Sequence, residues 1–153
     1  MAPTTRIIES NVPTELCWPG TGGTPMAKVP IYISFDCDHG SDLKILLVGQ
    51  SHIPDSPFDI ADYSIKDASP DWKAKARVRI RRVQQVIVIC GQYTETATGV
   101  NVEIGIAREE NKPYFLLAGR AIGHNKRPTA ALRSDQLYKW TWPNLKSLIA
   151  GRR

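Results

Sequence analysis

The run Val86-Ile-Val-Ile-Cys90 constrains the fold of this 153-residue chain more than any other segment. Charged residues lie before it and Gly91-Gln92 follows it, so it is typical of a strand that is buried on both faces of a parallel sheet. A polar loop and a predicted helix, Gly99–Asn111, come next. Because parallel strands need a crossover connection, the run predicts a sheet whose strands alternate with helices.

The rest of the chain alternates in the same way. Strands are predicted at Pro30–Phe35, Phe58–Tyr63 and Pro113–Ala118, and helices at Asp42–Gln50, 70–82 and about Trp142–Ile149. The basic residues of 72–82 recur with period two, as in a strand, but Ser69-Pro70-Asp71 is typical of a helix start with Ser69 as the N-cap. The alternation predicts an α/β fold with a doubly wound parallel sheet, in which ligands bind at the carboxyl ends of the strands.

One domain is expected, spanning residues 29–153 and preceded by an N-terminal extension, residues 1–28. The extension contains four prolines and the run Gly20-Thr-Gly-Gly-Thr-Pro25, which break regular structure. Met26 lies directly before the first strand and is an alternative start of translation. In that case residues 1–25 would not belong to the protein.

The composition is that of a soluble globular domain. Apolar residues make up 42% of the chain and charged residues 23%, and no apolar run approaches the ~20 residues of a membrane helix. Three cysteines occur without C-x-x-C spacing, at positions 17, 37 and 90. The sequence therefore predicts a cytoplasmic protein without a disulfide framework or a zinc site, and no contact with a membrane.

The net charge of +5 is distributed unevenly. Residues 72–82 hold six basic residues and no acid, and residues 112–133 hold five more, again without an acid. Such clusters attract nucleic acid or a small molecule that carries phosphate. A solvated helix face explains residues 72–82 better, because no aromatic residues interleave with the charge and no nucleic-acid motif accompanies it. Nucleic acid is therefore not the expected partner.

Glu103 is the residue of the predicted Gly99–Asn111 helix whose position is least favourable for stability. Its neighbours one turn away are apolar or small, namely Gly99, Val100, Ile106 and Ala107. A carboxylate that is buried among such residues costs free energy unless it is paired, and burial raises its pKa. Glu103 is thus a candidate for catalysis. Two structural interpretations stay open at this point, since the side chain can reach solvent at the helix edge or pair with an arginine.

Other chemistries receive less support from the loops that follow the strands. Asp36-Cys37-Asp38-His39 is the densest polar cluster, but adjacent residues on one loop converge poorly on one metal ion, so no metal site is predicted. Cys37 or Cys90 with His39 would make a thiol nucleophile, although a buried structural cysteine is the more common case. Cys90 also occupies the position at which a receiver domain carries its phosphoacceptor aspartate, and no phosphate-loop or dinucleotide-binding glycine motif is present.

Five motifs together carry a resemblance to a known family. They are Ile33-Ser-Phe-Asp-Cys-Asp-His39, Asp55-Ser-Pro-Phe-Asp-Ile60, Trp72-Lys-Ala-Lys-Ala-Arg77, Val86-Ile-Val-Ile-Cys90 and Tyr138-Lys-Trp-Thr-Trp142. In this order and spacing they resemble the TIR-like domain family of the Thoeris anti-phage defence system, over roughly residues 30–150. The resemblance implies a flavodoxin-like sheet in a three-layer α/β/α fold.

The resemblance also implies an enzyme that uses NAD as its substrate and needs no other cofactor. TIR enzymes cleave the bond between nicotinamide and ribose, and then hydrolyse or cyclise the ADP-ribose part. In Thoeris systems the cyclic product is a signal for a separate effector protein. Glu103 occupies the position of the family's catalytic glutamate. TIR enzymes often have a Trp-Cys pair shortly before this residue, where this chain has Gly99-Val100.

Six further residues are expected to bind NAD by this resemblance. Ser34, Phe35 and Asp36 approach from the first loop, and Ser64, Lys66 and Trp72 approach from the segment after the second strand. Lys66 or a nearby arginine would meet the pyrophosphate. A homo-oligomer is possible. The alternative function is that of a non-catalytic TIR-type interaction or nucleotide-binding module, in which Glu103 has only a structural role.

Overall fold

A computed structural model describes residues 28–64, 69–121 and 123–152. Within these residues the strands are β1 (Val29–Ser34), β2 (Phe58–Tyr63), β3 (Gln85–Cys90), β4 (Tyr114–Ala118) and β5 (Leu137–Lys139). The helices are α1 (Ser41–Ser51), α2 (Trp72–Arg81), α3 (Thr98–Glu109) and α4 (Trp142–Ile149), with a short 3-10 turn, η1 (Thr94–Thr96), before α3.

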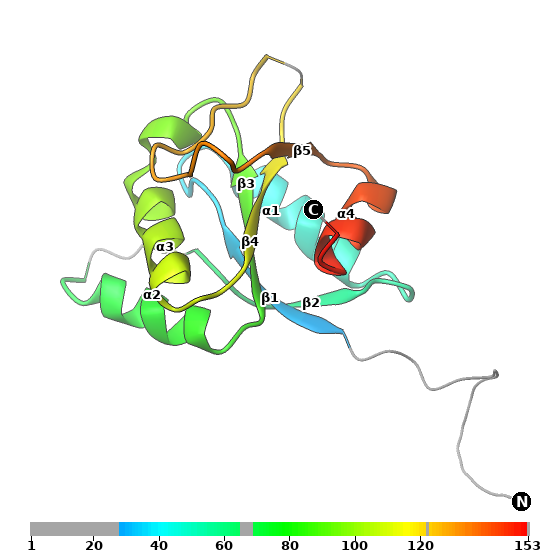
Figure 1. Ribbon diagram of the computed structural model, residues 1–153, viewed down its shortest axis with the longest axis horizontal. Coiled ribbons are helices and arrows are strands. Elements are labelled where there is room, and N and C mark those ends of the chain that lie inside the picture. Colours follow the sequence, from blue (N-terminus) through cyan, green and yellow to red (C-terminus); the bar gives the residue numbers. More distant parts are fainter. Residues whose placement is uncertain (1–27, 65–68, 122, 153) are drawn as a thin grey trace, which may run out of the picture.

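The five strands form one parallel sheet in the order β2-β1-β3-β4-β5 (Figure 1). This is the strand order of flavodoxin-like folds, and the order reverses between β1 and β3. The predicted fold class is confirmed. Ligands of such sheets bind outside the carboxyl ends of the strands at the reversal, which here is the edge that carries the loops after β1 and β3.

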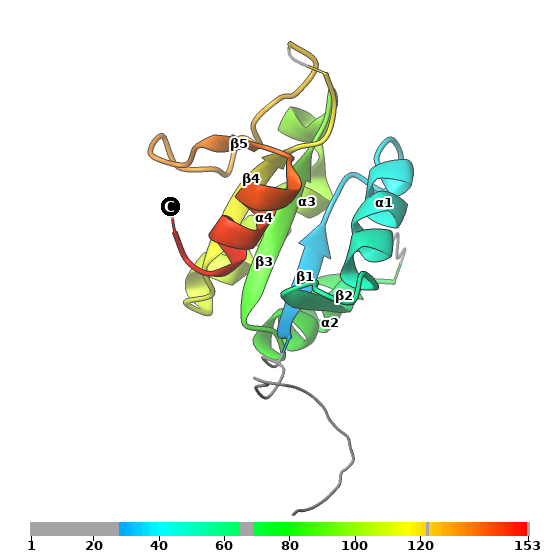
Figure 2. The same cartoon turned by 90° about the vertical axis from the view of Figure 1, so that its right-hand side faces the viewer.

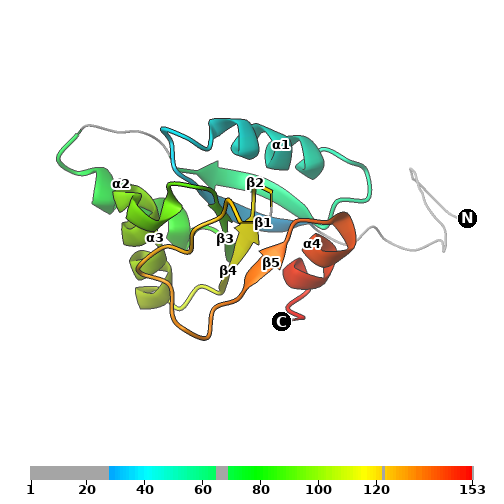
Figure 3. The same cartoon turned by 90° about the horizontal axis from the view of Figure 1, so that it is seen from above.

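Helices cover both faces of the sheet. Figure 2 shows α1 and α4 in front of the strands, and Figure 3, the view from above, shows α2 and α3 on the other side. Successive residues of a strand point to opposite faces. Ile31, Ile33, Ile87 and Ile89 therefore pack in the core under α1 and α4. Their neighbours in sequence, including Tyr32 of β1 and Val86, Val88 and Cys90 of β3, pack toward α2 and α3.

The segment with alternating basic residues is helical, as predicted. Ala76 and Ile80, four residues apart, form the buried face of α2. Its arginines point outward and pair with acids, since Arg77 and Arg81 contact Glu110 and Arg79 contacts Asp62. The apolar spacing of the helix therefore decides the structure, and the period-two pattern reflects ion pairing on its outer face.

The predicted start of this helix is wrong by two residues. The N-cap is Asp71 and not Ser69, and its side chain makes no capping hydrogen bond. Residues 69–71 form a turn in which the amide of Trp72 donates to the carbonyl of Ser69. The Ser-Pro-Asp signal therefore marks the turn that precedes the helix.

The remaining predictions for the ends of the chain fall largely outside the described residues. Residues 1–27 of the predicted extension are among those that the structure does not describe. Lys28 is described, and its Nζ donates to the carbonyl of Ser51 at 3.0 Å. In the described part of the chain, every helix is too short or too polar to cross a bilayer.

Two glycines provide a matched test of the packing. A Cβ at Gly105, within α3, would meet nothing within 4 Å, whereas one at Gly119 would lie 2.6 Å from Leu43 Cδ1 and 3.0 Å from the Cys90 carbonyl. Gly105→Ala is expected to raise the free energy of unfolding by about 0.5–1 kcal/mol, because alanine loses less entropy in a helix. Gly119→Ala is expected to lower it by about 1–3 kcal/mol through overpacking. Urea denaturation measures both, and shifts of the same sign would contradict this account.

Candidate functional site

Glu103 lies on the buried face of α3, with Val100, Ile104 and Ala107. Glu103 is 3% exposed, so the interpretation that its side chain reaches solvent is wrong. None of the described residues forms a salt bridge with it. The apolar pattern of α3 thus turns a carboxylate toward the sheet, directly behind the carboxyl end of β1.

Three hydroxyl groups donate hydrogen bonds to the Glu103 carboxylate. Ser34 Oγ and Ser64 Oγ both donate to Oε1, at 2.7 and 2.5 Å, and the Tyr32 hydroxyl donates to Oε2. Tyr32 and Ser34 share the α3 face of β1 because they are two residues apart. Ser64 follows β2, the neighbouring strand, and its Oγ also accepts from the amide of Phe35 at 3.2 Å. Tyr32, Ser34 and Ser64 are called the hydroxyl cluster below.

Burial and hydrogen bonding act on the Glu103 pKa in opposite directions. Loss of water raises the pKa above its ordinary value, while the three donors of the hydroxyl cluster favour the charged form and lower it. Burial has the larger effect, so the net shift is upward. The pKa of Tyr32 is also raised, first by burial and then by the adjacent Glu103, so its hydroxyl keeps its proton and remains a donor.

A cavity of about 470 Å³ opens beside Glu103, at the carboxyl edge of the sheet. The loop after β1 lines one side of it, from Phe35 to His39, and residues 96–100, at the start of α3, line the other. Ser64 and Trp72 complete the wall. This volume is within the range of small-molecule sites, about 300–1,000 Å³. It is called the Glu103 cavity below.

The structure gathers most of the predicted site residues. Phe35, Asp36, Ser64 and Trp72 line the Glu103 cavity together with Glu103 itself. Ser34 lies behind them and contacts the carboxylate. Lys66 lies outside the described residues, so its predicted role stays a prediction.

Sequence reasoning missed Tyr32, His39 and Tyr93 as residues of this site. A signal for Tyr32 was present, because it precedes Ser34 by two residues in a strand and so shares its face. The positions of His39 and Tyr93 depend on loop conformations that no local pattern specifies. Gly99 and Val100, at the positions where the resemblance leads one to expect a Trp-Cys pair, both line the cavity, and a Cβ at Gly99 would meet nothing within 4 Å.

The alternative chemistries are poorly supported by the geometry. Cys90 is buried in the core under α2 and α3, and burial raises its pKa to about 12, which disfavours the thiolate that a nucleophile requires. Among the described residues, no three histidine, cysteine or acidic side chains converge as metal ligands would. Asp36 and His39 instead contact each other, with Oδ2 and Nδ1 2.8 Å apart.

A second cavity, of about 250 Å³, adjoins the first. Asp36, His39 and Tyr93 line both, and the second is closed by Gly40 and Leu43 of the α1 start and by Arg120. Arg120 makes a bidentate ion pair with Asp42, with distances of 2.7 and 3.0 Å. It also donates to the carbonyl of His39 at 2.8 Å, so it fixes the loop between β1 and α1.

Comparison with protein families places this geometry in context. The family described as Thoeris protein ThsB, TIR-like domain, matches the chain over residues 32–119, which is more than half of its length. The chain belongs to this family. The match begins within β1 and ends after β4, so it includes Glu103 and the whole wall of the Glu103 cavity. A search of curated proteins finds no match. Membership of the ThsB TIR-like family supports a role in Thoeris defence.

Glu103→Gln is expected to stabilise this TIR-like domain at neutral pH, by about 0.5–2 kcal/mol, the range of common stabilising substitutions. A glutamine can keep all three hydrogen bonds: Oε1 accepts from both serines, and Nε2 donates to the Tyr32 oxygen after the hydroxyl rotates. The substitution removes the buried charge and reverses the direction of the hydrogen bond to Tyr32.

The pH dependence of the free energy of unfolding tests whether removal of the buried charge causes this stabilisation. The raised pKa of Glu103 means that the folded wild type binds more protons than the unfolded chain above the ordinary glutamate pKa of 4.5. Its stability therefore falls as pH rises from there through the folded-state pKa. The advantage of Glu103→Gln should vanish below this window and be largest above it. Urea denaturation across the acid-to-neutral range measures this, and a pH-independent difference would contradict it.

Proposed function

We propose that this chain cleaves NAD at the bond between nicotinamide and ribose and releases a cyclic ADP-ribose-type signalling nucleotide in Thoeris defence. The observation that carries the proposal is a buried carboxylate, Glu103, which opens onto a cavity of about 470 Å³ and is held by three hydroxyl donors. This placement has a cost in stability, and such costs are concentrated at functional sites.

A single oriented carboxylate suits this reaction. Nicotinamide leaves as a neutral molecule, so its departure needs no strong general acid. Positive charge develops on the ribose in the oxocarbenium-like transition state, and an anionic group that is fixed in place stabilises it. In the proposed complex Glu103 Oε1 accepts hydrogen bonds from Ser34 and Ser64 and is therefore occupied. Oε2 accepts one and has capacity for a ribose hydroxyl.

The walls of the Glu103 cavity supply the remaining contacts. Phe35 and Trp72 offer apolar and aromatic surface to the nicotinamide or the adenine. Asp36 offers acceptors to hydroxyl groups, and Lys66 would meet the pyrophosphate. Ser64 acts through Glu103, which it contacts directly, and so orients the carboxylate.

Cyclisation requires that water be excluded and that an adenine nitrogen or a ribose hydroxyl reach the reactive carbon. The product would act on a separate effector protein, and no further cofactor takes part in the scheme. In this proposal the enzyme is cytoplasmic and works without a membrane or a nucleic acid. The ion pairs of Arg77, Arg79 and Arg81 support the last point, because they neutralise much of the basic face of α2. Assembly into a homo-oligomer is compatible with the scheme.

The alternative function, that of a non-catalytic TIR-type interaction or nucleotide-binding module, is less well supported. Neither kind of module requires a carboxylate that is buried at a cost in stability. A shallow pocket that excludes the nicotinamide ribose would have favoured it, whereas Glu103 itself lines the cavity.

Release of nicotinamide from NAD tests the role of Glu103 directly. Glu103→Gln is expected to reduce the rate at least about 10²-fold, since it removes the charge that stabilises the transition state. Glu109→Gln is the matched control, because Glu109 is an exposed residue of the same helix and pairs with Arg77. Equal release by wild type and Glu103→Gln would exclude the catalytic assignment. Mass spectrometry of the wild-type product then separates cyclisation from hydrolysis.

The hydroxyl cluster predicts the pH dependence of the reaction. Catalysis needs the charged form of Glu103, so activity should fall toward acid, with a midpoint above the ordinary glutamate range because burial raises the pKa. Tyr32→Phe removes one donor to the charged form. The substitution is expected to move this midpoint to higher pH, while the rate at the pH optimum changes little. An unchanged or lower midpoint in the pH–rate profile would argue against the proposed role of Tyr32.

A further inference from the structure

Where a hydroxyl group, and not an adenine nitrogen, attacks the ribose, the proposed reaction leaves one proton without an acceptor. When a hydroxyl oxygen, from water or a ribose, replaces nicotinamide on the ribose carbon, its proton must be removed. Glu103 is poorly suited to take it, because three hydroxyl groups already donate to its two oxygens and its remaining capacity faces the substrate ribose. A second group in the wall of the Glu103 cavity is needed for this step.

His39 lines the Glu103 cavity and is oriented by Asp36. The distance between His39 Nδ1 and Asp36 Oδ2 is 2.8 Å. A carboxylate only accepts hydrogen bonds, so Nδ1 carries the hydrogen, and the lone pair of the neutral ring is on Nε2. Asp36 is itself fixed, since the amide of Asp38 donates to Oδ1 at 3.0 Å. This is the arrangement by which an acidic residue selects the tautomer of a general base.

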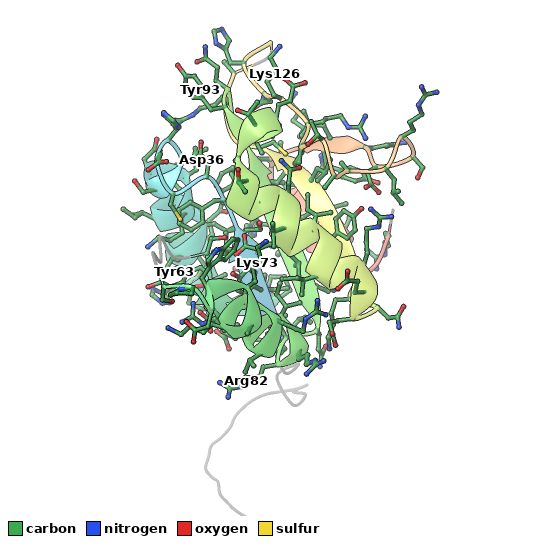
Figure 4. All side chains as sticks on the ribbon, turned by 90° about the vertical axis from the view of Figure 1, so that its left-hand side faces the viewer. Asp36, Tyr63, Lys73, Arg82, Tyr93 and Lys126 are labelled. Atoms are coloured by element: carbon green, nitrogen blue, oxygen red, sulfur yellow. The ribbon has the colours of Figure 1, made fainter. Side chains whose placement is uncertain are left out.

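Two further contacts hold His39, one to its ring and one to its main chain. The ring packs against Tyr93, with ring centroids 4.2 Å apart and an interplanar angle of 32°. Arg120 donates to the carbonyl of His39 at 2.8 Å. Figure 4 shows Asp36 and Tyr93 at the same edge of the molecule, far from Arg82 at the opposite edge. The ring is therefore pre-organised from three segments: the loop after β1, the loop after β3 and the loop after β4.

The second ring nitrogen remains available. Nε2 of His39 has no hydrogen-bond partner among residues 28–64, 69–121 and 123–152. The side chain is 52% exposed, so a proton that it accepts can pass to water. The Asp36 side chain is 14% exposed, so the Asp36 end of the Asp36–His39 pair is largely shielded from water.

We propose that His39, positioned by Asp36, is the general base that removes the proton from the hydroxyl group attacking the ribose in the Glu103 cavity. This rests on the proposed function. The bond from the ribose carbon to the nicotinamide nitrogen breaks, and its electron pair stays on nicotinamide. The hydroxyl oxygen forms the new bond to the carbon, its proton moves to His39 Nε2, and the imidazolium pairs with Asp36 before it returns the proton to water.

The experiment compares wild type with His39→Ala, using NAD and isotope-labelled nicotinamide. Two rates are measured: transfer of the ADP-ribose part to a hydroxyl, and exchange of nicotinamide. Without the base, the ribose cation is captured slowly and returns to nicotinamide. Transfer is expected to fall about 10²-fold or more while exchange continues, so the ratio of exchange to transfer rises. Added imidazole is expected to restore part of the transfer.

His52→Ala is the matched control, because His52 is exposed at the far end of α1. Transfer at the wild-type rate by His39→Ala overturns the inference and leaves the role of Glu103 intact. A parallel fall of both rates, without rescue by imidazole, also overturns it, since a merely structural role has that effect. If the wild type releases no nicotinamide from NAD, or if Glu103→Gln matches it, the proposed function fails and His39 loses its role with it.

Discussion

The burial of the Glu103 carboxylate is the constraint on which the rest of the site depends. A carboxylate without water is tolerated only where hydrogen-bond donors replace the water, and here the donors come from β1 and from the residue that follows β2. β1 and β2 are neighbours in the sheet, and α3 crosses behind β1 on the same face. The parallel topology therefore assembles, from three distant parts of the chain, what no single loop provides.

On the outer surface, in contrast, charged side chains form ion pairs. Charges on α2 and at the end of α3 pair with each other in exposed or half-buried positions at the surface, where each pair contributes little to stability. The pKa of Glu110 is lowered to about 2 by its hydrogen bonds to Arg81 and Arg77. These pairs cancel charge and set the contact between the two helices. Among the residues that the structure describes, Glu103 at the carboxyl edge of the sheet is the buried carboxylate without a salt bridge.

Much of the fold follows from the sequence, because it depends on short periodic patterns. The apolar run of β3, the alternation in β1 and the spacing of Ala76 and Ile80 each specify a local structure and a buried face. The position of Glu103 on an apolar face is predictable for the same reason. Its partners are harder to predict, since Ser64 is 39 residues away and is brought close only by strand pairing. His39 and Tyr93 meet through two loops without repeating patterns, and the N-cap of α2 is set by a turn that resembles a helix start.

Ser64 links two parts of the site through a single oxygen atom. Its hydroxyl donates to Glu103 and accepts from the amide of Phe35, so the loop after β1 and the carboxylate share it as a common partner. Any ligand that displaces this loop weakens the hold on the Ser64 hydroxyl and, through it, the stabilisation of the negative charge. The proton affinity of Glu103 is therefore a readout of loop conformation. If Glu103 acts in catalysis as proposed, the same group would register whether a ligand is seated in the cavity.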